Sequence, residues 1–299
     1  MRISTQTFFD SGAAKMGDLQ SGLLKTQLQI STGRRILSPS DDPVGAARAL
    51  EVGQTLALNT QHGINRNYAT GALVSVEGTL SSVTSLLQDV KTTIIAAGNG
   101  VLGDSERGFQ ATELRGRFEE LMGLANARDG VGNYLFSGFQ TNTPAFIQSV
   151  TGATYQGDSG QRLMQVDTTR QMAVSNTGQS VFQGGGQDMF ATLTALIARL
   201  ETPGTVGLSA ALTTANTDIE LALENVLTVR ASVGTRLQEL DSLNNAGADR
   251  NIQYSQTLSE LQDLDYTQAL TKLSQQQVTL EAAQRTFVTT SKLSLFNFI

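Results

Sequence analysis

Residues 73–97 read LVSVEGTLSSVTSLLQDVKTTIIAA and hold the clearest helical pattern of the chain. Apolar residues recur every seven positions in two series, the second three places after the first: Leu73, Leu80, Leu87 and Ile94, then Val76, Val83, Val90 and Ala97. A full a/d pattern sustained over four heptads is typical of a helix that packs along a partner helix. The stretch therefore predicts a long helix of a helical bundle.

Capping and turn residues mark both ends of this helix. Asp42 is a good N-cap, Pro43 suits the first helical position, and Gly98 follows the last heptad residue. The adjacent Asp41 and Asp42 could also be read as an acid pair or as metal ligands. No His or third carboxylate lies nearby in the sequence, so we favour capping. We expect the helix to run from about residue 43 to residue 97.

Two further amphipathic helices complete the expected bundle. The shorter one should end at residues 128–130 and has Leu114, Phe118, Leu121 and Ala125 on one face. The longer one carries Ile219, Val226, Val233 and Leu240 at heptad spacing. The predicted fold class is mainly α, an elongated antiparallel helical bundle with coiled-coil terminal helices and a small inserted β-rich domain.

Both ends of the chain carry one apolar residue every seven positions, while the second heptad position is weak or polar. These anchors are Phe9, Met16, Leu23, Ile30, Tyr266, Leu273, Leu280 and Phe287. Because thin seams are marginal in water, we expect both ends to be largely disordered in the monomer and helical only when packed on each other and on other subunits. The eight anchors are the predicted subunit interface. The alternative is two ordinary amphipathic helices of a globular bundle.

Residues 139–203 form the expected insert. The runs 153–156 and 162–166 flank Gly157–Gly160 and predict a hairpin, and residues 172–174 and 180–182 are further strand candidates. We expect the insert to fold nearly independently around a small apolar set: Tyr155, Met164, Val166, Val174 and Phe182. The expected domains are residues 1–42 with 256–299, residues 43–138 with 204–255, and residues 139–203.

The composition excludes several classes of protein. The 299 residues include no Cys and one His, which argues against disulfide scaffolds, thiol chemistry and multi-His metal sites. A net charge of −6 argues against a nucleic-acid or anionic-membrane binder, and no apolar run is long enough to span a bilayer. His62 lies on a heptad row, and the pair Arg34-Arg35 has no aromatic platform beside it. We therefore predict no enzyme activity, no cofactor and no metal.

Two terminal blocks resemble the bacterial flagellin family. Residues 29–45 read QISTGRRILSPSDDPVG and residues 265–280 read DYTQALTKLSQQQVTL, which are similar to the N-terminal and C-terminal signatures of that family. Residues 132–146 (GNYLFSGFQTNTPAF) and the ending at residues 293–299 (LSLFNFI) look more like a hook-associated member than like flagellin itself.

The resemblance implies a secreted structural protein at the junction between the flagellar hook and the filament. Its implied partners are the first hook-associated protein FlgK, flagellin, other copies of the chain in a ring, and an export chaperone of the FlgN type, with neither nucleic acid nor membrane. It also implies flagellum-specific type III export, and terminal helices that pack between subunits into an inner tube. A filament-forming flagellin is the main alternative. A type III translocator, a coiled-coil adhesin and an enzyme with its site in the insert are more distant ones.

Overall fold

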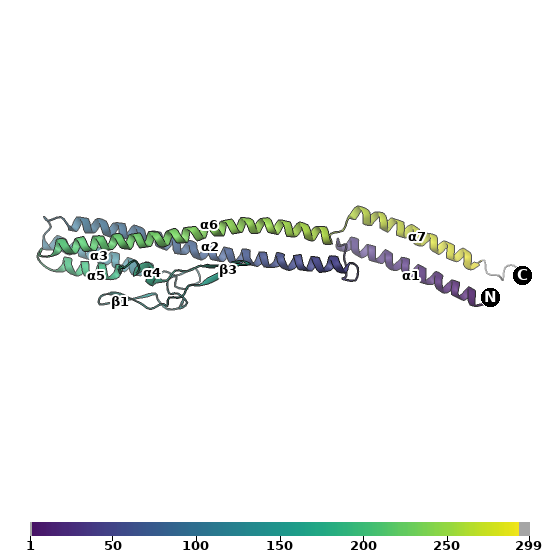
Figure 1. Cartoon of the computed structure of the whole chain (residues 1–299), viewed down its shortest axis with the longest axis horizontal. Helices are drawn as coiled ribbons and strands as arrows, with labels where there is room; N and C mark the ends of the chain where they lie inside the picture. The colour runs from purple at the N-terminus through teal and green to yellow at the C-terminus, as the bar shows by residue number, and fades with distance from the viewer. Residues whose placement is uncertain (1, 293–299) are drawn as a thin grey trace. The chain divides into compact units, whose positions relative to one another are not determined.

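The structure is a computed structural model that describes residues 2–292, so the ending at residues 293–299 lies outside the described residues. The chain is mainly helical (Figure 1), and its elements follow in this order: α1 (Arg2–Thr32), α2 (Pro43–Ala97), α3 (Asp104–Ala125), β1 (Phe146–Ser149), β2 (Gly152–Tyr155), β3 (Leu163–Asp167), β4 (Arg170–Ala173), α4 (Gly178–Phe182), α5 (Met189–Glu201), α6 (Leu208–Gln262) and α7 (Tyr266–Lys292).

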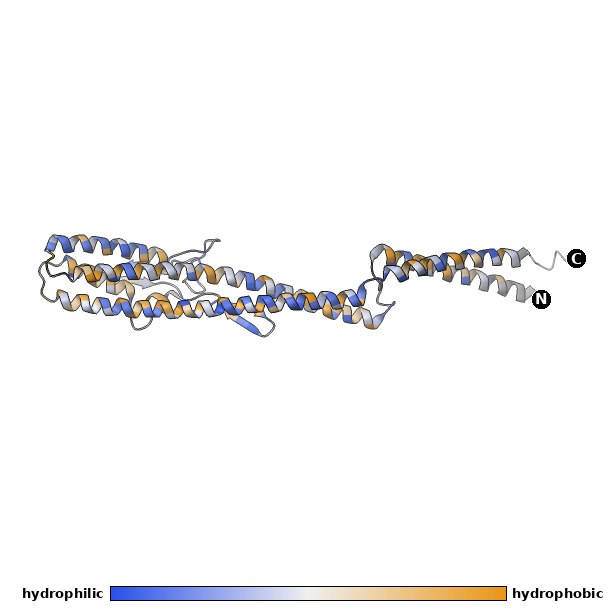
Figure 2. Cartoon of the chain, turned by 90° about the horizontal axis from the view of Figure 1, so that it is seen from above, coloured by the Kyte–Doolittle hydropathy of each residue, from blue (hydrophilic) through white to orange (hydrophobic). Residues whose placement is uncertain are grey.

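The chain divides into two compact units, residues 1–58 with 249–299 and residues 59–248. In the first unit α1 packs against α7. In the second unit α2 and α6 run side by side in opposite directions, and α5 packs against α3 (Figure 1). An ion pair joins α2 to α6, because the Arg230 guanidinium lies 2.7 Å from Glu77 Oε1. Hydrophobic and hydrophilic residues alternate along the long helices, as expected for amphipathic helices (Figure 2).

The predicted bundle core is confirmed. All eight heptad residues between Leu73 and Ala97 are buried, as are Ile219, Val226, Val233 and Leu240 of α6. Helix α2 begins at Pro43 and ends at Ala97, as predicted. Asp42 caps it, since its Oδ1 accepts the Gly45 N–H at 2.9 Å.

Helix α3 buries the four predicted residues but ends at Ala125, earlier than predicted. The side chain of the next residue, Asn126, makes the two hydrogen bonds to Phe146 that the backbone of a neighbouring strand would make. Its Nδ2 donates to the Phe146 carbonyl and its Oδ1 accepts the Phe146 N–H, both at 2.9 Å. This pairing takes Asn126 out of the helix and fixes the start of β1.

The predicted hairpin across residues 157–160 is wrong. β1 pairs with β2 and β3 pairs with β4, in two separate antiparallel sheets. Residues 157–160 link the two hairpins instead, because Asp158 Oδ1 accepts the N–H of Gly160 at 2.7 Å and that of Phe139 at 3.0 Å. The predicted strand at 180–182 is also wrong, since those residues belong to α4, which Thr177 caps.

The insert does not bury an apolar set of its own. Phe146 and Phe182 lie in one ring cluster with Phe190 of α5, and the rings of Phe190 and Phe118 of α3 meet edge to face with centroids 5.9 Å apart. Val166, Val174 and Phe182 join the same hydrophobic core as the bundle, with Tyr155 and Met164 packed against it. Small hairpins of this size are marginal alone, and these are stabilised by the helices beneath them.

Candidate subunit interface on the terminal helices

The eight predicted interface residues lie on α1 and α7, in the unit where these two helices pack. Seven of them are half-buried, on the faces where one helix meets the other, and the eighth, Tyr266, is 51% exposed. The most buried side chains of this seam are Thr26 and Ala269, at the second heptad position that the sequence analysis judged weak. Small residues there let the two backbones approach closely, so the seam is narrow but well packed.

Phe9 and Phe287 close the seam near the chain ends. Their rings meet edge to face with centroids 5.7 Å apart. Gly12 makes room for this contact, because a Cβ atom at that position would lie 2.7 Å from the Phe287 ring. The buried Thr26 hydroxyl has a hydrogen-bond partner in its own helix, because its Oγ1 donates to the Gly22 carbonyl at 3.1 Å.

A second apolar row on these helices faces solvent, and the sequence analysis missed it. Its members are about half exposed or more: Leu24, Leu28, Leu270, Val278 and Val288. They lie outside the seven-residue series, which drew attention to the seam alone. The sequence could have identified them, because they are large apolar residues on helices whose remaining exposed positions are mostly Ser, Thr and Gln.

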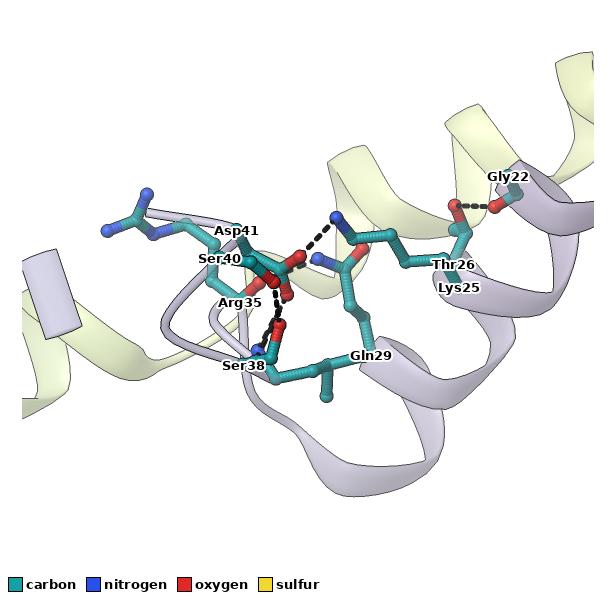
Figure 3. A network of polar contacts seen from close by, with 9 residues as sticks. Gly22, Lys25, Thr26, Gln29, Arg35, Ser38, Ser40 and Asp41 are labelled. Carbon is teal, nitrogen blue, oxygen red and sulfur yellow. Dashed lines mark hydrogen bonds and ion pairs between the residues drawn. The ribbon is translucent and has the colours of Figure 1, made fainter. Parts of the chain in front are cut away.

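The link between α1 and α2 is held to α1 by polar contacts (Figure 3). Asp41 binds Lys25 of α1 at 2.6 Å and accepts the N–H groups of Leu37 and Ser38, each at 3.2 Å. Gln29 Nε2 donates to the Arg35 carbonyl at 2.6 Å. Lys25 and Gln29 thereby hold the link against α1, while the Leu37 and Ser38 N–H groups hold Asp41 within the link.

The link before α7 is joined to this one through the backbone. Arg34 and Asp263 form an antiparallel bridge, in which the Arg35 N–H donates to the Gln262 carbonyl at 2.7 Å and the Leu264 N–H donates to the Gly33 carbonyl at 3.0 Å. Gly33 has a φ of +68°, and a Cβ there would lie 2.9 Å from the Tyr266 hydroxyl. The two signature blocks, at residues 29–45 and 265–280, therefore meet in one joint.

Two ion pairs lie in this joint, Lys25 with Asp41 and Arg35 with Asp42. Arg35 donates to the Leu261 carbonyl at 2.8 Å and lies 3.3 Å from Asp42 Oδ2, so this member of the basic pair makes contacts within the joint. The hydrogen bond from Lys25, supported by the two backbone N–H groups, lowers the pKa of the Asp41 carboxyl below its ordinary value of 3.8. Asp41 and Asp42 thus cap and fasten the link rather than form an acid pair.

No group of three or more His, Cys, Asp or Glu side chains that could hold a metal ion occurs within residues 2–292. His62 is half-buried on α2, and within the same range none of the helices is both long and apolar enough to cross a membrane.

Known proteins of the flagellum are similar to the chain. Residues 3–141 match the bacterial flagellin N-terminal helical region. The flagellar hook-associated protein 3 of Salmonella typhimurium is 36% identical, and that of Escherichia coli is 35% identical, each over 99% of both chains.

Solved structures share the fold. One from Vibrio parahaemolyticus, described as a flagellar hook-associated protein, is 27% identical with a TM-score of 0.69, over 75% of this chain and 100% of that one. The flagellar junction protein FlgL of Legionella pneumophila is 21% identical with a TM-score of 0.62, over 72% of this chain and 100% of that one. At full-length identities above one third, the chain belongs to the flagellar hook-associated protein 3 (FlgL) family, structural proteins of the bacterial flagellum.

Proposed function

We propose that the chain joins the hook to the filament by contacting FlgK on one side and flagellin on the other, with the α1–α7 pair as its assembly element. One observation carries this proposal: α1 and α7 pack on each other along one face and still present the apolar row Leu24, Leu28, Leu270, Val278 and Val288 to solvent. Burying apolar surface contributes about 25 cal/mol per Å², so these side chains favour association with further helices.

The eight anchors and the outward row have complementary roles in this proposal. The anchors fasten α1 to α7, so that each assembled subunit contributes a helix pair. The outward row then meets the helix pairs of neighbouring copies in a ring. Tyr266, which is exposed, takes part both in the α1–α7 seam and in the contact with the neighbouring copy. In this proposal residues 1–42 with 256–299 are the assembly domain, residues 43–138 with 204–255 the supporting bundle, and residues 139–203 the insert.

An export chaperone of the FlgN type fits the same surface. Before assembly, Leu270, Val278 and Val288 of α7 would be open to water, where apolar rows promote aggregation. We assign the chaperone to α7 because covering this row keeps the subunit soluble and leaves the second unit free to unfold for export.

Deletion of the gene, followed by electron microscopy and analysis of the culture medium, tests the proposed function. We expect hooks without filaments, and flagellin shed into the medium, with both defects restored by the gene supplied on a plasmid. A filament-forming flagellin would behave differently, because the purified chain would polymerise by itself into long filaments. Attached filaments of normal length in the deletion strain would overturn the proposed function.

A further inference from the structure

A groove with a volume of about 760 Å³ opens on the surface of the second unit, lined by residues of α2, of the segment after α3 and of β3. The large apolar side chains along it are 61–83% exposed: Tyr68, Val131, Phe139 and Leu163. A pocket for a small molecule encloses most of the ligand, whereas these walls are open to solvent. Exposed apolar surface of this kind is typical of a contact with another protein.

Arg162, the residue before β3, brings hydrogen-bond donors to this groove. Its backbone is held in place, since its N–H donates to Ser175 Oγ at 2.9 Å and its carbonyl accepts the Val174 N–H at 2.8 Å. Its guanidinium, in contrast, forms neither a hydrogen bond nor an ion pair with any of residues 2–292, and the Nε atom is buried without a partner. Buried donors in proteins are normally hydrogen-bonded, so the groove has an unmet need for an acceptor.

The other charged residue of the groove, Asp129, is engaged within its own loop. Its Oδ1 accepts the N–H of Val131 at 3.0 Å and that of Asn133 at 2.8 Å, and its Oδ2 accepts the Asn133 side-chain amide at 3.3 Å. Burial raises the pKa of the Asp129 carboxyl, but these bonds and the nearby charge of Arg162 lower it below its ordinary value of 3.8. An occupant of the groove must therefore bring the acceptor for Arg162 itself.

A single carboxylate suits these donors. The planar fork of an arginine pairs with a carboxylate through two parallel hydrogen bonds. The exposed rings of Tyr68 and Phe139 in the same groove provide apolar surface for a side chain next to that carboxylate. A polyanion fits less well, because residues 59–248 contain 11 basic and 17 acidic residues and so carry a net charge of −6.

Both walls of the groove are fixed in the chain by itself. β3 is fastened to α2, since the Arg66 guanidinium donates to the Val166 carbonyl at 3.0 Å. In the segment after α3, the Arg128 guanidinium lies 4.3 Å from the centre of the Tyr134 ring. A site that is formed in advance loses little entropy when a partner binds.

We propose that this groove docks a segment of a neighbouring flagellar protein that carries an Asp or Glu beside a large apolar residue. Arg162 binds the carboxylate, and Tyr68 and Phe139 cover the apolar side chain. The inference rests on the proposed function, which brings the chain into contact with other proteins of the flagellum, and it names one such contact. Two copies of residues 59–248 repel each other through their equal charge, so the expected partner is a different protein.

Photo-cross-linking in assembled flagella identifies the occupant. The photoreactive amino acid p-benzoylphenylalanine replaces Phe139 in the full chain, the variant is expressed in the deletion strain, and isolated hook–filament complexes are irradiated. Mass spectrometry should locate the cross-link in a different flagellar protein, in a segment that contains an Asp or Glu next to a large apolar residue. Val131, which also lines the groove, is a second position for the probe where the Phe139 variant does not assemble.

Substitutions of Arg162 then test its role. Arg162→Gln should lower the cross-link yield roughly tenfold, the loss expected for one hydrogen bond to a charged group. Arg162→Glu should abolish the cross-link, and replacing the identified acidic residue of the partner by Arg should restore it. Arg170→Gln is the matched control and should leave the yield unchanged, since this exposed arginine of β4 is already paired with Glu239 at 2.6 Å.

Three results would show that the proposed contact is wrong while the proposed function stands. Attached filaments form but neither probe position gives a cross-link, the cross-link joins only copies of this chain, or the linked segment contains no acidic residue. Equal yields with Arg162 and with Arg162→Gln would also overturn the contact. Loss of filaments in the deletion strain is scored separately, so failure of the contact and failure of the proposed function are distinguishable.

Discussion

Phe9 and Phe287 come from opposite ends of the chain and pack edge to face, with their ring planes at 89° to each other. The contact shows that the first and last helices form one seam within a single subunit. We therefore expect a substitution in this seam to disturb the helix pair first, and the proposed contacts with neighbouring subunits as a consequence.

Leu280→Asp should disrupt assembly without unfolding the rest of the chain. A carboxylate at this half-buried position costs about 1–3 kcal/mol in the α1–α7 seam. We expect cells with normal hooks and few filaments, and a purified protein whose melting temperature is unchanged, because the core of residues 59–248 does not include Leu280. Gln277→Asp, an exposed position of the same helix, is the matched control. Normal filament numbers with Leu280→Asp would remove this residue from the interface.

The purified monomer should lose both ends to limited proteolysis and leave one core fragment of about residues 43–255. The seam of α1 and α7 is a single narrow row, whereas α2 and α6 share a full a/d core, so the terminal pair opens at a lower free energy. Mass spectrometry of the fragments identifies the cut sites. Protection of residues 7–30 in dilute monomer would contradict the expectation that the ends become ordered on assembly.

Leu87→Ala should destabilise the bundle by about 2–5 kcal/mol, because Leu87 is fully buried and the surrounding helices cannot close the cavity. Urea unfolding followed by circular dichroism measures the loss. Val74→Ala on the same helix is the control, since Val74 is more than half exposed and should change stability by less than about 0.5 kcal/mol. Equal effects of the two substitutions would show that the heptad register is misassigned.

The sequence was sufficient for the helices and insufficient for the insert. Heptad spacing identified α2 and α6 because burial repeats with the helical period, and Asp42 and Pro43 fixed the start of α2. The strand pairing could not be read in the same way. Gly157–Gly160 has the composition of a hairpin turn, yet Asp158 ties it to Phe139, a contact that depends on tertiary structure. Replacing residues 142–186 by a linker should unfold the bundle, since Phe146 and Phe182 belong to its hydrophobic core.

The seam between α1 and α7 was predicted in part. The seven-residue series located the seam. The positions of Thr26 and Ala269 appeared to contribute little because their side chains are small or polar, yet both are buried, since the two helix backbones approach closely there. The joint between residues 33–42 and 263–265 was not predicted at all, since its bonds are mainly between backbone atoms far apart in the sequence.

The stability contributed by the Asp41–Lys25 ion pair should decrease at low pH. The folded-state pKa of Asp41 is lowered below its ordinary value of 3.8, so its contribution to stability is fully present above pH 3.8 and is lost as the pH falls through the folded-state pKa. Lys25→Gln should raise the pKa of Asp41, measured by NMR titration of the carboxyl carbon. Lys15→Gln should leave it unchanged, because Lys15 pairs with Asp18 instead. An unchanged titration in Lys25→Gln would show that Lys25 does not hold Asp41 in solution.

Two glycines of α6 provide the sharpest test of the link between the bundle and the β3–β4 hairpin. Arg66 of α2 is 3% exposed, and its guanidinium donates to Asn244 Oδ1 at 2.7 Å and to the Val166 carbonyl at 3.0 Å. Gly247 leaves the space for this side chain, because a Cβ there would lie 2.2 Å from Arg66 Nη2. Gly234 has no atom within 4 Å of its Cβ position.

Gly247→Ala and Gly234→Ala should therefore change stability in opposite directions. Ala is favoured over Gly inside a helix by about 0.8–1 kcal/mol, so Gly234→Ala should raise the free energy of unfolding by roughly that amount. Gly247→Ala gains the same helix propensity, but it displaces the guanidinium and leaves buried acceptors unpaired, at about 1–3 kcal/mol each. We expect a net loss in urea unfolding, together with faster hydrogen exchange in residues 163–173, which lose their contact with Arg66. If both substitutions stabilise the protein equally, the displaced Arg66 side chain finds other hydrogen-bond partners without loss of stability. The β3–β4 hairpin is then held by its apolar contacts alone.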